Sequence, residues 1–194
     1  MNDEEEKLNK ASQELKDLMT YIFNVHKSVT KVEVAFSAMI LKKAIDIIDT
    51  AKFALKKYNI TIQISLLRLL CDNCLAIEAA REVGLSRYIE MVNNGERVSD
   101  IIVDPEIEQN MSDGYLKKNV AKDYKGFDKL YNFACESVHF SKQAIANAFI
   151  KEDDKVKINI EVGNKNQKEV IIKNNSQMII LTKVIKDMLI KLCL

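Results

Sequence analysis

The stretch ITIQISLLRLLCDNCLAIEAAREVG, residues 60–84, predicts the most apolar long helix of the chain. At helical spacing its leucine, isoleucine and cysteine side chains point in nearly all directions, as they do in a helix that is covered on every side. Thr61 can begin this helix and Gly84 can end it. We therefore expect it to lie at the centre of the fold, where each of its few polar residues needs a partner.

The composition favours a mainly all-α fold. The 194 residues include 5 glycines, 1 proline and no tryptophan, whereas β-sandwiches and barrels need many turn residues. A hydrophobic fraction of 47% supports a substantial core. We predict a single helical domain over residues 1–194, a bundle of about five to seven helices.

Apolar residues at helical spacing predict the other helices. The longest connection is expected at residues 96–111, which hold the only proline, Pro105; connections of this length are often functional. Ser112 or Asp113 can cap the helix that follows. The remaining helices are expected at residues 2–27, 30–59, 85–95, 112–124 and 127–150.

A change of period predicts a C-terminal β-hairpin at residues 155–174. Residues 156–162 alternate apolar and polar side chains, GNKNQ at 163–167 suits a hairpin loop, and KEVIIK at 168–173 is expected to pair back. An isolated hairpin is marginally stable in water, so it must lie on the helices or pair with another chain. A closing helix over 176–193 is apolar around most of its circumference. Hairpin and closing helix together predict a homodimer or a protein partner.

Charge and cysteine usage restrict the location and the partners. Lysine and arginine (29) nearly balance aspartate and glutamate (28), so nucleic-acid binding, although left open, has no support from the charge. The acidic start MNDEEEKLNK is unlike a signal peptide, and no segment reads as a membrane span. The four cysteines show no disulfide framework, which favours the cytoplasm.

No cofactor and no metal site is predicted. The chain has no phosphate-binding glycine loop, no dinucleotide fingerprint and no HExxH segment. Cys71 and Cys74 have CxxC spacing, but they lie inside an apolar helix and no second pair exists to complete a zinc site. We interpret them as small core residues.

Arg68 and Asp72 form the first candidate for a site. They are spaced i, i+4, so they share one stripe of the predicted central helix and can pair directly. An arginine cannot lose its charge on burial and must be paired. The pair is therefore either an ion pair that fixes helix packing or a guanidinium positioned to hold a phosphate or carboxylate.

The segment CESVHFS, residues 135–141, provides the second candidate. Glu136 and His139 are i, i+3 neighbours, and a carboxylate beside an imidazole orients the ring and favours its charged form. Such a histidine suits general acid–base catalysis, although it also suits a core or capping position. If His139 faces Arg68, these two residues would be catalytic, with Glu136 and Asp72 orienting them.

Four segments together resemble a group of uncharacterised bacterial helical proteins. The segments are LLRLLCDNCLAIEAA, VNNG, MSDGYL and YNFACESVHFS, and the resemblance covers about residues 62–145. This group carries no function that can be transferred to the chain. We predict Arg68, Asn73, Tyr131 and Ser141 as candidate ligand-binding residues. The shared positions are Arg68, Asp72, Asn73, Gly95, Ser112, Asp113, Tyr115, Leu116, Tyr131, His139 and Ser141.

The expected bundle, with arginine and histidine on separate core helices, also distantly resembles the HEPN superfamily. That resemblance implies a metal-independent ribonuclease or a partner of a nucleotidyltransferase. The usual HEPN signature, an arginine followed a few residues later by a histidine, is absent from this chain. Two functions stay open: an interaction or ligand/nucleotide-binding module with a polar Arg/Asp/Glu/His cluster, or a HEPN-like ribonuclease or other small phosphate-directed enzyme that uses Arg68 and His139.

Overall fold

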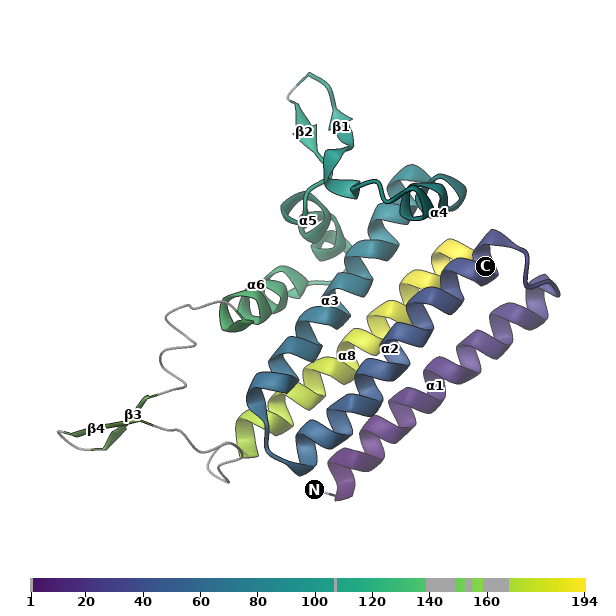
Figure 1. Cartoon of the computed structure of the whole chain (residues 1–194). Coiled ribbons are helices and arrows are strands. Elements are labelled where there is room, and N and C mark those ends of the chain that lie inside the picture. The colour runs from purple at the N-terminus through teal and green to yellow at the C-terminus, as the bar shows by residue number, and fades with distance from the viewer. Residues whose placement is uncertain (1, 107, 139–148, 153–154, 159–167) are drawn as a thin grey trace.

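The computed structural model describes residues 2–106, 108–138, 149–152, 155–158 and 168–194, and these residues form a helical bundle with short hairpins (Figure 1). The predicted all-α class with a small β-hairpin is therefore confirmed. The helices are α1 (Asn2–His26), α2 (Val32–Lys56), α3 (Ile60–Val83), α4 (Leu85–Asn94), α5 (Asp113–Asp123), α6 (Phe127–Val138) and α8 (Lys168–Cys193).

Four long helices, α1, α2, α3 and α8, lie side by side (Figure 1). Helices α1, α3 and α8 run in one direction and α2 runs in the other. Contacts at both ends of α8 agree with this arrangement. Near its start Asn175 Oδ1 accepts from Gln63 Nε2 of α3 (2.6 Å), and at its end the Cys193 carbonyl lies 2.7 Å from His26 Nε2 of α1.

Helix α3 occupies the centre, as its sequence predicts. It contacts α2 and α8 within the bundle, and α4, α5 and α6 on its other side. Leu67, Leu70, Cys71 and Cys74 are fully buried. Among the described helices α3 alone is long and apolar enough to span a membrane, but a core helix has the same composition, and its neighbours here enclose it.

The ends of α3 show why it begins and stops where it does. Asn59, rather than the expected Thr61, is the N-cap, and its side chain accepts a hydrogen bond from the Ile62 amide (3.0 Å). Gly84 ends the helix with φ of +86°, in a region that side-chain-bearing residues rarely adopt. The chain can therefore turn at once into α4.

Residues 96–111 contain more regular structure than the sequence predicts. A short 3₁₀ helix, Val98–Asp100, precedes an antiparallel pair of strands, β1 (Ile102–Asp104) and β2 (Gln109–Asn110). Pro105 follows β1 directly, where a fixed φ favours a turn. These strands are shorter than an alternation pattern can detect, so the sequence predicted the connection but not the strands within it.

The C-terminal hairpin exists, but the predicted extent of 155–174 was wrong. Strand β4 (Lys155–Ile158) pairs with β3 (Phe149–Glu152), which precedes it, and residues 168–174 form the first two turns of α8. The helix predicted to reach residue 150 is therefore too long. Residues 168–173 are helical because Ile171 and Asn174 bury the same face as Met178 and Leu181 further along α8. The predicted loop at 163–167 lies outside the described residues.

Most of the apolar surface of α8 is used inside the bundle. Its side chains Ile171, Met178, Leu181, Ile185 and Leu189 are buried against the other helices. The large apolar residues that it leaves exposed are Val170, Ile180 and Ile190, and exposed Leu194 follows its end. A partner surface on α8 is therefore restricted to these positions.

Burial on α3 predicts the effect of two neighbouring leucines on stability. Leu67 is fully buried and Leu69 is 39% exposed. We expect Leu67→Ala to lower the free energy of unfolding by about 2–5 kcal/mol, because it leaves a cavity in the core. The matched variant Leu69→Ala should cost less than about 1 kcal/mol. Urea denaturation followed by circular dichroism measures both, and equal losses would contradict the central position of α3.

Candidate functional site

Arg68 joins three helices through a network that we call the Arg68 clasp, formed by Arg68, Asp72, Asp113 and Tyr131. The guanidinium pairs with Asp72 one turn further along α3. Its Nη2 donates to the Tyr131 hydroxyl of α6 (2.6 Å) and to Asp113 Oδ2 of α5 (3.2 Å). The Tyr131 hydroxyl donates to the same Asp113 oxygen (2.6 Å). The clasp therefore fastens α5 and α6 to the central helix.

Local sequence explains how the partners of Arg68 reach it. Ser112 is the N-cap of α5 and accepts from the Tyr115 amide (3.3 Å), which places Asp113 in the first turn. A carboxylate is favourable there because of the positive end of the helix dipole. Tyr131 follows Phe127 by one turn on the buried face of α6, and its ring centroid lies 4.2 Å from the guanidinium carbon.

Within the clasp the guanidinium already has carboxylate partners, and the ammonium of Lys117 lies nearby, 5.4 Å from the centroid of the Tyr131 ring. One guanidinium faces two carboxylates, so the cluster carries a formal charge of −1. Burial, followed by the hydrogen bond to Asp113, raises the pKa of Tyr131, so its hydroxyl stays protonated and remains a donor. A phosphate could reach Arg68 only by displacing Asp72 or Asp113. The arrangement therefore suits a structural ion pair better than an anion site.

The structure brings together three of the predicted site residues and separates a fourth from them. Arg68, Asp72 and Tyr131 meet in the clasp. Asn73 is buried on another face of α3, where its Nδ2 donates to the Ile40 carbonyl of α2 (3.4 Å). Glu136 is exposed on α6.

His139 and Ser141 lie outside the described residues, so their proximity to Arg68 stays a prediction. Asp113 was expected only as a cap and was missed as a partner of Arg68. The one signal for it was its place in the MSDGYL segment of the resemblance.

The two central cysteines behave as core residues. Burial raises the pKa of Cys71 to about 12 and that of Cys74 well above its ordinary value. Neither thiol therefore ionises near neutral pH. Within the part of the chain that the structure describes, no group of three histidine, cysteine or acidic side chains is placed to hold a metal ion.

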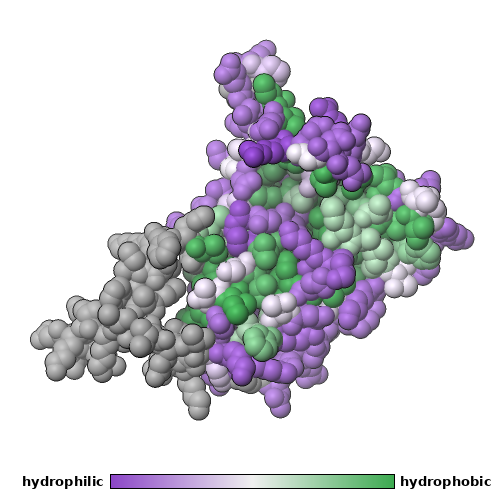
Figure 2. Space-filling model, in the orientation of Figure 1, coloured by the Kyte–Doolittle hydropathy of each residue, from purple (hydrophilic) through white to green (hydrophobic). Residues whose placement is uncertain are grey.

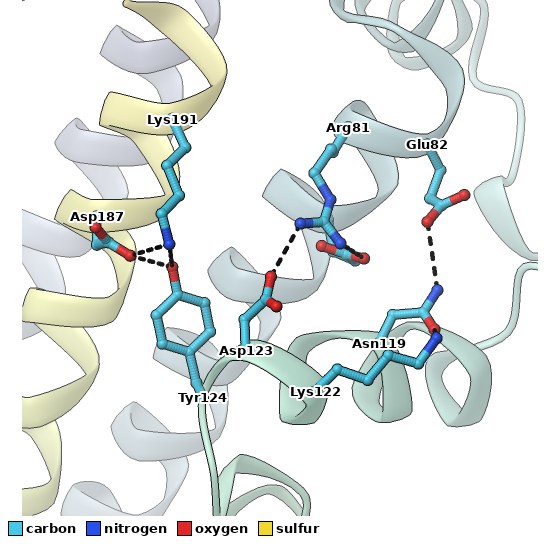
Figure 3. Close-up of polar contacts among 9 residues, drawn as sticks. Arg81, Glu82, Asn119, Lys122, Asp123, Tyr124, Asp187 and Lys191 are labelled. Carbon is cyan, nitrogen blue, oxygen red and sulfur yellow. Dashed lines mark hydrogen bonds and ion pairs between the residues drawn. The ribbon is translucent and has the colours of Figure 1, made fainter.

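A second set of polar contacts fastens α5 and the turn after it (Figure 3). Arg81 of α3 pairs with Glu78 (2.7 Å) and with Asp123 at the end of α5 (3.1 Å). Tyr124 then donates to Asp187 Oδ2 of α8 (2.5 Å), beside Lys191, whose ammonium lies 2.7 Å from the same carboxylate. The turn between α5 and α6 is thus held against α8.

A pocket of about 430 Å³ lies between α6 and α8, next to this turn. Most of its walls are apolar. The polar side chains that line it include three lysines. The lining comprises Tyr124, Lys125, Gly126, Phe127, Lys129, Leu130 and Phe133 on the α6 side, and Lys173, Gln177, Ile180, Leu181 and Val184 of α8. We call it the α6–α8 pocket.

A second hollow lies between α2 and α3, and Figure 2 shows apolar side chains gathered over these helices. It has a volume of about 500 Å³ and is more open to solvent. Its cations are partly neutralised, because Lys42 pairs with Asp46. The lining residues are Met39, Lys42, Lys43, Asp46, Ile47, Thr50, Leu66 and Leu69. We call it the α2–α3 groove.

Comparisons with protein families, with curated proteins and with solved structures found no match to this chain. The resemblances to the bacterial helical group and to the HEPN superfamily therefore stay predictions. The function has to be argued from the geometry.

The clasp predicts that Arg68 contributes to stability. We expect Arg68→Met to lower the free energy of unfolding by about 1–3 kcal/mol, because it removes charge-assisted hydrogen bonds and leaves two carboxylates unpaired. Arg87→Met, at an exposed arginine of α4, should change it by less than about 0.5 kcal/mol. Urea denaturation measures the free energy of unfolding of both variants. If Arg68→Met unfolds with the same free energy as the wild type, the clasp does not stabilise the fold.

The contacts of Asp187 predict that the stability of the fold depends on pH. Lys191 and then Tyr124 hold its pKa below the ordinary value of 3.8. A lowered pKa contributes stability that is present above the ordinary value and is lost as the pH falls through the folded-state value. We expect the stability difference between wild type and Asp187→Asn to be largest near neutral pH and to shrink below about pH 4. Thermal unfolding between pH 7 and about pH 3 tests this, and a difference that is constant with pH would exclude it.

Proposed function

We propose that this chain is a helical ligand-binding module whose binding site is the α6–α8 pocket. The observation that carries the proposal is the pocket itself, which has about 430 Å³ of space and predominantly apolar walls. Small-molecule sites of proteins commonly have this size, with apolar walls and a few placed polar groups. Ile180, which is 56% exposed, accounts for part of the apolar surface that α8 leaves uncovered.

The polar networks support this proposal because they hold both walls of the pocket. The clasp fixes α6 to α3 through Tyr131. The contact between Tyr124 and Asp187 fixes the start of α6 to α8. A pocket whose walls are held in this way loses less conformational entropy when a ligand binds. In this proposal Arg68 acts through the position of α6 and does not touch the ligand.

Catalysis at Arg68 has less support. Asp72 and Asp113 neutralise the guanidinium that a HEPN-like ribonuclease would use for phosphate. A ribonuclease with Arg68 and His139 as catalytic residues stays the alternative, since His139 lies outside the described residues.

The four cysteines are unpaired, which agrees with a proposed cytoplasmic location. A homodimer or protein partner would use the exposed apolar residues of α8 or the hairpin.

A neutral fluorophore tests the proposed function. N-phenylnaphthylamine emits more strongly in an apolar site, and we expect it to saturate one site per chain. Ile180→Glu should weaken its binding by about tenfold or more, because the variant puts a charge on the pocket wall. Leu69→Glu, at a residue of the α2–α3 groove, is the matched control and should leave binding unchanged. Absence of saturable binding, or loss of binding in Leu69→Glu alone, would refute the proposal.

A further inference from the structure

The lysines of the α6–α8 pocket lack acceptors. Lys125, Lys129 and Lys173 line the pocket, and none of them makes a hydrogen bond or an ion pair within the described residues. Some other lysines of α5 and α8, in contrast, have partners. Lys122 donates to Asn119, Lys186 pairs with Glu14 and Lys191 pairs with Asp187.

The three lysines, which have no partner within the described residues, come from different segments and line the same largely apolar pocket. Lys125 lies in the turn before α6, Lys129 lies in α6 and Lys173 lies in α8. Among the residues that the structure describes, no aspartate or glutamate lines the pocket. Cations that converge on a low-dielectric wall attract an anion and repel an ammonium group. The long apolar stems of the lysines extend the walls while their charges stay near water.

Gln177 adds a polar group without a partner. Its Oε1 is buried and has no hydrogen-bond partner among the described residues, and the side chain lines the pocket one helical turn after Lys173. A buried polar atom left unpaired is costly, so native structures usually satisfy it. Rotation of the amide offers a head group either the oxygen or the NH₂ group. A ligand head placed beside Lys173 would therefore find both a charge and a hydrogen-bonding group.

We propose that the α6–α8 pocket binds an amphipathic anion: an apolar chain or ring between Leu130, Phe133 and Ile180, and a carboxylate or phosphate monoester at the three lysines. This inference rests on the proposed function and names its ligand class. The apolar part sets the affinity, at about fourfold for each buried methylene. The anionic head sets the selectivity, at about three- to fivefold for each lysine that it reaches at this solvent-exposed rim.

Displacement of N-phenylnaphthylamine by four ten-carbon ligands tests the ligand class. The ligands are decanoate, decyl phosphate, decanol and decyltrimethylammonium, each below its critical micelle concentration. We expect both anions to displace the fluorophore at about tenfold lower concentration than decanol, and the ammonium to be the weakest. The ratio of decanoate to decyl phosphate tells which anion the lysines prefer.

Lysine variants test the origin of the selectivity. In the double variant Lys129→Gln/Lys173→Gln we expect the preference for anions over decanol to fall to about twofold or less, with the fluorophore affinity of the same variant measured as the reference for both ligands. Lys118→Gln, at an exposed lysine of α5 outside the pocket, should keep the full preference. This control separates a local effect from a change in net charge.

The outcomes distinguish the ligand class from the proposed function. If the fluorophore binds but decanol displaces it as well as decanoate does, the anion proposal fails and the binding module stands. The same holds if the double variant keeps the anion preference. Calorimetric titration of decanoate into the wild-type chain removes the dependence on the fluorophore, and absence of binding there overturns the proposal directly.

Discussion

The need to cover most of the apolar surface of α3 is the constraint on which the rest of the structure depends. Exposed apolar surface loses the stabilisation that drives folding, so α2, α8 and the α4–α6 segment all pack on this helix. The four-helix bundle supplies two of these neighbours. The short helices α5 and α6 cover a side that the bundle leaves open, which explains why they pack on α3 and not on α1.

The polar residues of α3 then determine the position and orientation of α5 and α6. A buried or half-buried charge needs a partner, and an arginine cannot escape that need by losing its proton. Arg68 takes its partners from α5 and α6, and Arg81 takes one from the end of α5. The charged groups contribute orientation more than net stability, because their desolvation offsets much of the attraction.

The pocket is a consequence of this packing. Helix α6 is held by its Tyr131 side to α3, and its start is held to α8 through Tyr124. Between these two attachments the facing surfaces of α6 and α8 carry Leu130, Phe133 and Ile180, which enclose space without filling it. In the proposal, the three lysines at its rim, which have no partner within the described residues, give that space a preference for anions. In the same proposal, the clasp supports α6 and the pocket residues contact the ligand.

The sequence by itself determined most of the helices, the central place of α3, a cap at Ser112 or Asp113, the stop at Gly84 and the possible pair of Arg68 with Asp72. Each of these depends on residues within one or two helical turns, where periodicity and side-chain chemistry are sufficient. Only the tertiary structure decided which segment pairs with β4, that Asp113 and Tyr131 meet Arg68, and that α6 and α8 enclose a pocket. These depend on contacts between segments far apart in the chain, and local periodicity identifies an apolar face without specifying the surface that will cover it.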